Sequence, residues 1–160
     1  MITFTLCLLA LIIGYFTYGR FLLLLAPAKA QPKYEVRAAW VTAVYGLDWP
    51  RTKATTPTAI RRQQEELTDI LDKLKAANFN TILFQTRTRG DVLYHSSIEP
   101  YNSILTGKVD GDPGYDPLAF AVRECHKRGM ECHAWMVAIP LGNKKHVASL
   151  GNKSVTKQRK

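Results

Sequence analysis

Residues 80–94, NTILFQTRTRGDVLY, join a short apolar run to a loop that is crowded with polar side chains. Over residues 81–87 a period of two divides the side chains between two faces of a strand, with Ile82, Phe84 and Thr86 on one face and Leu83, Gln85 and Arg87 on the other. The second face becomes polar towards its end. This pattern is typical of a buried parallel strand whose carboxyl end lines a ligand crevice, although a strand end that simply enters solvent has the same pattern.

The first 30 of the 160 residues differ from the rest of the chain. Residues 1–26 are almost wholly apolar, with Arg20 as their only charged side chain, and the small-x-small pattern of residues 28–30 precedes Gln31. We interpret residues 1–30 as the signal peptide of a secreted or periplasmic protein, cleaved after Ala30. The alternatives are an uncleaved membrane anchor formed by residues 6–26 and a start of translation nearer Arg20.

The net charge of +9 is unevenly distributed along the chain. Residues 31–143 contain 14 Lys plus Arg and 13 Asp plus Glu, whereas residues 144–160 contain 6 basic residues and no acidic one. A nucleic-acid-binding protein is expected to carry its positive charge on the folded body, as a stripe or a cleft. We therefore expect no nucleic-acid partner, and contact with a membrane only through an uncleaved leader.

Two cysteines, Cys125 and Cys132, lie beyond the leader. We expect one on a helix and the other on the following strand, with Cα atoms roughly 10 Å apart, which is beyond disulfide reach and predicts free thiols. Neither a Cys-x-x-Cys pair nor a His-Glu-x-x-His motif occurs, so we predict no metal site. We also expect no cofactor, since a Gly-x-Gly-x-x-Gly turn, the signature of dinucleotide binding, is absent after the first predicted strand.

The chain beyond residue 35 reads as alternating strands and helices. We expect strands at residues 36–44, 81–87 and 131–137. One helix is expected to begin at Thr56-Pro57 and to end near Asn78, and a second to begin at Asp116-Pro117 and to end near Gly129. Residues 90–115 are expected to form a long structured loop. This β-α-β-α-β order predicts the α/β class, with a parallel sheet and right-handed crossovers. A (β/α)8 TIM barrel fits best, because polar and aromatic residues follow each predicted strand. We assign residues 31–150 to a partial barrel domain and residues 151–160 to a truncated basic tail.

Six segments resemble, in the same order, the family-10-like glycosyl hydrolases: residues 36–42 (VRAAWVT), 46–50 (GLDWP), 85–94 (QTRTRGDVLY), 105–107 (LTG), 113–118 (PGYDPL) and 131–135 (ECHAW). The resemblance covers about residues 35–150. It implies the N-terminal part of an exported (β/α)8 barrel that hydrolyses polysaccharide, cell-wall glycan included, through a pair of carboxylates. The sequence departs from the family at residues 136–143 (MVAIPLGN), where many members have Asn-Pro-Tyr.

The resemblance also implies that later strands, with the Asp-Tyr motif of the acidic machinery, would lie beyond Lys160. We therefore expect a truncated barrel that keeps substrate-binding residues but lacks the acid/base carboxylates, so the catalytic residues remain unassigned. Such a chain is expected to be inactive by itself. The alternative is a non-catalytic exported module that binds glycan and is complete at this length.

The candidate substrate-binding residues follow the predicted strands: Asp48, Trp49, Gln85, Arg87, Asp91, Tyr94, His133 and Trp135. Arg87 and, as a weaker candidate, Arg89 can donate hydrogen bonds to sugar hydroxyls, tryptophans can stack on sugar rings, and a histidine can orient a hydroxyl. The two aspartates are also candidates for a glycosidase pair, whose carboxyl groups lie about 5 to 9.5 Å apart. Each candidate has a structural alternative, which is turn capping for the aspartates, an ion pair with Asp91 or Glu99 for Arg87, and core packing for the tryptophans and His133.

Overall fold

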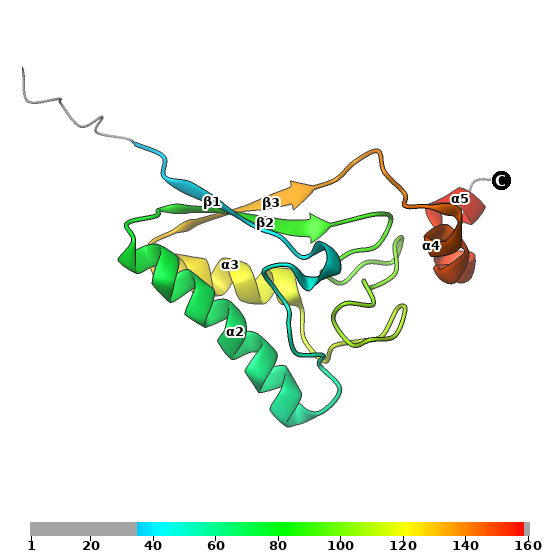
Figure 1. Ribbon diagram of the computed structural model, residues 1–160, viewed down its shortest axis with the longest axis horizontal. Coiled ribbons are helices and arrows are strands. Elements are labelled where there is room, and N and C mark those ends of the chain that lie inside the picture. The colour runs from blue at the N-terminus through cyan, green and yellow to red at the C-terminus, as the bar shows by residue number, and fades with distance from the viewer. Residues whose placement is uncertain (1–34, 159–160) are drawn as a thin grey trace, which may run out of the picture. The chain divides into compact units, whose positions relative to one another are not determined.

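The computed structural model describes residues 35–158, so the predicted leader at residues 1–30 lies outside the described residues. Three parallel strands, β1 (Ala38–Val41), β2 (Thr81–Arg87) and β3 (Glu131–Met136), form one sheet in the order β1-β2-β3. Helix α2 (Pro57–Ala76) connects β1 to β2, and helix α3 (Pro117–Lys127) connects β2 to β3. Both helices lie on the same side of the sheet (Figure 1). Helices on one face only are what the wall of a (β/α)8 barrel requires.

Both helices begin with the predicted cap and proline. The Thr56 side chain accepts a hydrogen bond from the amide of Ala59 at 3.2 Å, and the Asp116 side chain accepts one from Ala119 at 2.9 Å. The prolines that follow each cap occupy the first helical turn, where no hydrogen bond from their nitrogen is needed. These two starts confirm the prediction.

The ends of the helices and two of the strands also agree with the sequence. Asn78 after α2 and Gly129 after α3 have φ values of 63° and 61°, the left-handed conformation that ends a helix. Strand β2 has the predicted bounds, and β3 ends one residue earlier than predicted.

Strand β1 is much shorter than the predicted strand at residues 36–44. Its ladder stops at Val41, because the amides beyond it are bound by side chains instead of by a neighbouring strand. The Asp48 carboxylate accepts from the amide of Thr42 at 2.8 Å, and Gln85 Oε1 accepts from the amides that follow, at residues 43 and 44. The chain then forms the short 3-10 helix η1 (Val44–Gly46).

The core lies between the sheet and its two helices. It is formed by fully buried side chains from each layer, which include Ile82 and Phe84 of β2, Leu67 and Leu71 of α2, and Cys125 of α3. Cys125 and Cys132 are free, as predicted. A hydrogen bond with the Cys132 thiol, together with burial, raises the pKa of Cys125.

The connection from Thr88 to Tyr115 is ordered, as predicted, although it contains no helix or strand of its own. Val92, Leu93 and Leu105 are completely buried in it. Single bridges of Val92 with Arg87 and with Tyr101 tie the connection to itself and to the end of β2.

Part of the sheet face opposite the helices has no cover among the described residues. Trp40, Leu83 and His133 lie side by side across the three strands on this face, and Trp40 is 61% exposed. In a closed barrel the corresponding face points inward and is covered by the other strands.

After β3 come the short helices α4 (Lys144–Ser149), η2 (Gly151–Lys153) and α5 (Val155–Gln158). Residues 151–158 of the predicted basic tail therefore have a helical structure. Leu150 and Ser154 are buried here, so this part of the chain packs instead of extending into solvent. Within residues 35–158, no helix has the length and apolarity that crossing a membrane requires.

Candidate functional site

Trp49 belongs to the core. Its side chain has no exposed surface, its ring lies 5.6 Å from that of Phe84, and its indole nitrogen donates a hydrogen bond of 2.8 Å to the carbonyl of Gln63. A ring with both faces buried cannot stack on a sugar. The structural alternative, core packing, therefore describes Trp49.

Gln85 shapes the end of β1. Its Oε1 accepts hydrogen bonds of 2.9 Å from the amides of both Ala43 and Val44, and the residue is only 2% exposed. This buried amide group replaces strand pairing at the point where the chain leaves the sheet. Gln85 therefore positions the turn that follows β1, and its Oε1 points away from solvent.

Arg87 forms a buried ion pair with Glu99. Its Nε and Nη2 donate to the two carboxylate oxygens at 2.7 and 2.6 Å, and both side chains are 10% exposed. Nη1 donates to the carbonyls of Val137 and Ala138, just beyond β3. Hydrogen bonding to Glu99 raises the pKa of the Arg87 guanidinium. Arg87 thus ties the end of β2 to the long connection and to the segment after β3.

Asp91 is buried beside a histidine that the sequence analysis did not select. One carboxylate oxygen accepts from the Thr88 hydroxyl and from the amide of Arg89, and the other lies 3.5 Å from Nε2 of His146. The same Nε2 lies 3.1 Å from the Arg89 carbonyl, which can only accept, so this nitrogen carries a proton. Gly142 makes room for the imidazole, because a Cβ there would lie 2.4 Å from it.

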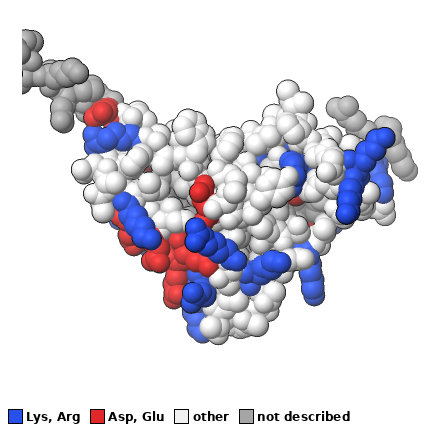
Figure 2. Space-filling model, in the orientation of Figure 1, with Lys and Arg blue, Asp and Glu red and all other residues white. Residues whose placement is uncertain are grey.

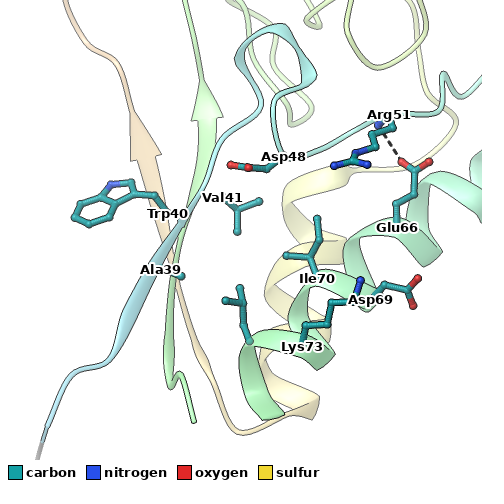
Figure 3. A pocket seen from close by; sticks show the side chains of 10 residues that line it. Ala39, Trp40, Val41, Asp48, Arg51, Glu66, Asp69, Ile70 and Lys73 are labelled. Atoms are coloured by element: carbon teal, nitrogen blue, oxygen red, sulfur yellow. Dashed lines mark hydrogen bonds between the residues drawn. The ribbon is translucent and has the colours of Figure 1, made fainter. Parts of the chain in front are cut away.

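Asp48 is exposed and caps the turn after β1 through its bond to the Thr42 amide. It lines a cavity of about 390 Å³ between the free edge of β1 and helix α2, together with Arg51, Glu66, Ile70 and others. Figure 3 shows this cavity, with Trp40 on the far side of β1 from Ile70. Asp48 lines this open cavity, whereas Asp91 is 2% exposed and bound by Thr88 and Arg89, so the two carboxylates do not face one site as a catalytic pair.

The cavity beside β1 is bordered by a strand edge and the flank of a helix, not by strand ends. In a closed barrel this is the place where a neighbouring βα unit packs. Figure 2 shows basic and acidic side chains interspersed over α2 at this flank. We therefore do not regard the cavity as the ligand site.

His133, Trp135 and Tyr94 retain some exposure. His133 lies on the uncovered sheet face, where its Nε2 is 2.9 Å from the Glu131 carboxylate, and both side chains face solvent. Trp135 and Tyr94 are half-buried. Their predicted contacts with substrate remain predictions.

A second, polar pocket of about 190 Å³ lies at the carboxyl ends of β1 and β2 and is lined by Tyr45, Lys53, Arg89, Asn102, Ser103, Ile104 and Gly107. Tyr45 is 74% exposed and has φ 57°, a left-handed conformation that is costly for a bulky residue. Nη1 of Arg89 donates to the Tyr45 hydroxyl at 2.8 Å, and the guanidinium carbon lies 4.7 Å from the centre of the ring. An exposed aromatic ring held beside an arginine is a surface on which a sugar can stack.

Of the residues that line this pocket, only Arg89 was considered from the sequence, as a weaker candidate than Arg87 for binding sugar hydroxyls. Its lining comes from two connections, residues 42–56 between β1 and α2 and residues 88–116 between β2 and α3, and no local spacing connects them. The other sequence signal was Tyr45-Gly46 at a strand end, which we interpreted as a break. Among residues 35–158 no cluster of His, Cys, Asp and Glu has the composition to hold a metal ion.

Comparison of the sequence with known proteins identifies the family of this chain. The family model described as glycosyl hydrolase-like 10 matches residues 35–158. The chain belongs to the glycosyl hydrolase-like 10 family. The match covers all of β1, α2, β2, α3 and β3, and it confirms the resemblance seen in the sequence.

Two relatives with curated names share this region. Glycosyl hydrolase YngK of Bacillus subtilis is 39% identical over 108 residues, which are 68% of this chain and 21% of that protein. Glycosyl hydrolase DigH of Escherichia coli K12 is 41% identical over 114 residues, which are 68% of this chain and 26% of that protein. The match thus spans about a fifth to a quarter of the length of these relatives.

Proposed function

We propose that this chain forms part of the glycan-binding crevice of an exported glycoside hydrolase that acts on polysaccharide, cell-wall glycan in particular. The observation that carries the proposal is the pair of Tyr45 and Arg89 at the carboxyl ends of β1 and β2. Family membership and the names of the relatives support a glycoside as the substrate. The carboxyl ends of the strands are where a (β/α)8 barrel binds its substrate.

In this proposal the chain binds glycan but does not supply the acid/base pair. Asp91 is almost completely buried and engaged by Thr88, Arg89 and His146, so it has no free access to a glycosidic oxygen. Hydrolysis requires two carboxylates on opposite sides of the scissile bond. Asp48 faces the side of the sheet instead of the strand-end pocket.

Binding can be tested with a backbone-matched substitution. Tyr45→Leu keeps a Cβ at the same positive φ but removes the aromatic face and the hydroxyl. Loss of one stacked ring should weaken binding of a β-linked N-acetylglucosamine oligosaccharide by about 3- to 10-fold. Ile98→Ala is the control, because Ile98 is 63% exposed and lies outside the pocket. Equal weakening by both substitutions, or by neither, would contradict the proposal.

A non-catalytic glycan-binding module is the second candidate, and the buried state of Asp91 favours it for this chain alone. The release of reducing ends from the same oligosaccharide separates the two functions. We expect binding without release. Turnover that Asp48→Asn or Asp91→Asn abolishes would show that this chain carries catalytic carboxylates after all.

Export is the part of the proposal that rests on the leader. If residues 28–30 form a cleavage site, exported protein should begin at Gln31. Mass spectrometry of protein from the periplasm or medium tests this prediction. Membrane-bound protein with an intact N-terminus would instead indicate an anchor formed by residues 6–26.

A further inference from the structure

The strand-end pocket has an unbalanced charge. Lys53 and Arg89 both line it, and none of its lining residues is acidic. Of the three described arginines that are not exposed, Arg87 pairs with Glu99 and Arg128 pairs with Asp72 and Glu124, whereas Arg89 has no carboxylate partner within residues 35–158. Lys53 has none in this region either. Arg89 is partly buried, and a desolvated cation without a partner is costly, so Arg89 with the exposed Lys53 beside it points to an anion from outside.

The hydrogen-bonding capacity of Arg89 is largely unused. Its Nη1 donates to the Tyr45 hydroxyl, but its Nε is buried and finds no partner in the described structure. Nearly all buried polar groups in native proteins are hydrogen-bonded, and each exception requires an explanation. The planar guanidinium matches a carboxylate, which accepts two parallel hydrogen bonds from it.

Two further contacts hold the pocket in shape. The stem of Lys53 crosses Gly107, where an added Cβ would lie 3.0 Å from Cδ and 3.3 Å from Nζ of the lysine. Gly107 also has φ +83°, so the absence of a side chain both permits the turn and lets the ammonium group lie over it. Asn102, which is 7% exposed, is fixed by its bonds to Thr88 and to the amide of Ile104.

We propose that the pocket of Tyr45, Lys53, Arg89 and Asn102 binds a carboxylate carried by a sugar residue, and therefore selects acidic glycans. This inference rests on the proposed function and names its substrate class. A volume of about 190 Å³ is too small for a chain of sugar rings but holds one substituent and its bridging waters. Tyr45, which is exposed beside the pocket, provides the face against which the ring bearing that substituent packs.

The test compares three ligands on the full-length chain by titration calorimetry. They are a neutral N-acetylglucosamine oligosaccharide, an alternating oligosaccharide of the same length in which every second residue carries a lactyl carboxylate, and that second glycan with its carboxylates reduced to alcohols. At low salt the acidic glycan should bind at least about 10-fold more tightly than its reduced form, and the advantage should shrink as salt is raised. A uronic acid oligosaccharide distinguishes recognition of any sugar carboxylate from recognition of the lactyl type.

Matched variants locate the effect. Lys53→Gln and Arg89→Gln should each remove most of the difference between the acidic and the reduced glycan. Lys108→Gln, which removes an exposed lysine that does not line the pocket, should retain it. Lys53 is itself exposed, so its substitution should leave the fold intact even if Arg89→Gln disturbs Tyr45. Affinities are compared per folded molecule, with the folded fraction taken from the unfolding transition of each variant.

The outcomes separate this inference from the proposed function. Equal affinity of the wild-type chain for the acidic and reduced glycans would overturn the carboxylate site while leaving glycan binding in place. A difference that persists in both Lys53→Gln and Arg89→Gln would also overturn it. If neither the neutral nor the acidic glycan binds, the proposed function fails and the inference fails with it.

Discussion

Glu99→Gln is the sharpest test of how the strand-end loops are held. The substitution preserves the shape of the side chain but removes the negative charge that faces Arg87. The guanidinium would keep its bonds to the carbonyls of Val137 and Ala138, neither of which carries a net charge. It would then lie in a nearly dry site without its counter-charge.

The magnitude follows from the burial of the pair. Removing one partner of a fully buried ion pair costs about 3–5 kcal/mol, whereas exposed pairs contribute about 0–1 kcal/mol. With both side chains 10% exposed, we expect Glu99→Gln to lower the free energy of unfolding by about 2–4 kcal/mol. Arg87→Met should cost a similar amount. The double variant Arg87→Met/Glu99→Gln should cost no more than either single one, because it leaves no unpaired charge, which gives a coupling of about 2 kcal/mol or more.

Urea unfolding followed by tryptophan fluorescence provides the assay, since Trp49 is buried beside Phe84 and urea does not screen charge. Asp72→Asn is the control, because Asp72 pairs with Arg128 from an exposed position and its loss should have a much smaller effect. A coupling below about 0.5 kcal/mol would refute the reasoning, since that value is typical of solvated pairs.

Three further outcomes are expected. Trp49→Ala should lower the free energy of unfolding by about 3–5 kcal/mol, measured by urea denaturation followed by circular dichroism, and an effect under about 1 kcal/mol would contradict its core role. Burial raises the pKa of Tyr115, whose hydroxyl donates to Gln63 at 2.6 Å, so the unfolded chain ionises first and stability should fall above about pH 10. Tyr115→Phe should reduce that fall, and an unchanged pH profile between about pH 9 and 11 would exclude Tyr115 as its source. Gly142→Ala should destabilise the packing of His146, because the new Cβ would lie 2.4 Å from the imidazole ring at φ +87°. Proton NMR should then show shifted signals of the His146 ring, and unchanged signals would contradict this contact.

The elements that could be predicted from the sequence are those with local signals. A period of two defined β2, and a Thr or Asp followed by proline defined both helix starts, because each of these patterns acts within a few residues. The left-handed ends at Asn78 and Gly129 are equally local. All of these predictions were confirmed.

The early end of β1 could not be predicted in this way. Residues 36–44 have the composition of a strand, but Gln85 and Asp48 bind the amides that a longer ladder would have used. Gln85 lies 42 residues after Ala43, whose amide it binds, and Asp48 lies 6 residues after Thr42. Strand propensity alone therefore overestimates the length of β1.

The sequence indicated the strand ends as the place of the candidate site, and Arg89 was the one residue of the strand-end pocket that it brought forward. Polar groups at the strand ends correctly indicated where the carboxyl edge of the sheet lies. Several of them, such as Gln85, Arg87 and Asp91, are almost completely buried and bind other parts of the same chain. Tyr45 and Lys53 were not predicted, because residues that line a pocket between separate loops follow no regular spacing in the sequence.

The long connection after β2 has a consequence for the thermodynamics of binding. Its backbone is already fixed, because the amide of Val92 donates to the Pro100 carbonyl at 3.0 Å and the amide of Asn102 donates to the Val92 carbonyl at 2.9 Å. Leu93 and Leu105 of the same connection are completely buried. The conformational entropy of these residues is lost when the chain folds, so a ligand that binds to Arg89 and Asn102 contacts a surface that is already preorganised. Association should then show the small heat-capacity change of a rigid site, without the large entropic penalty that accompanies the ordering of a loop.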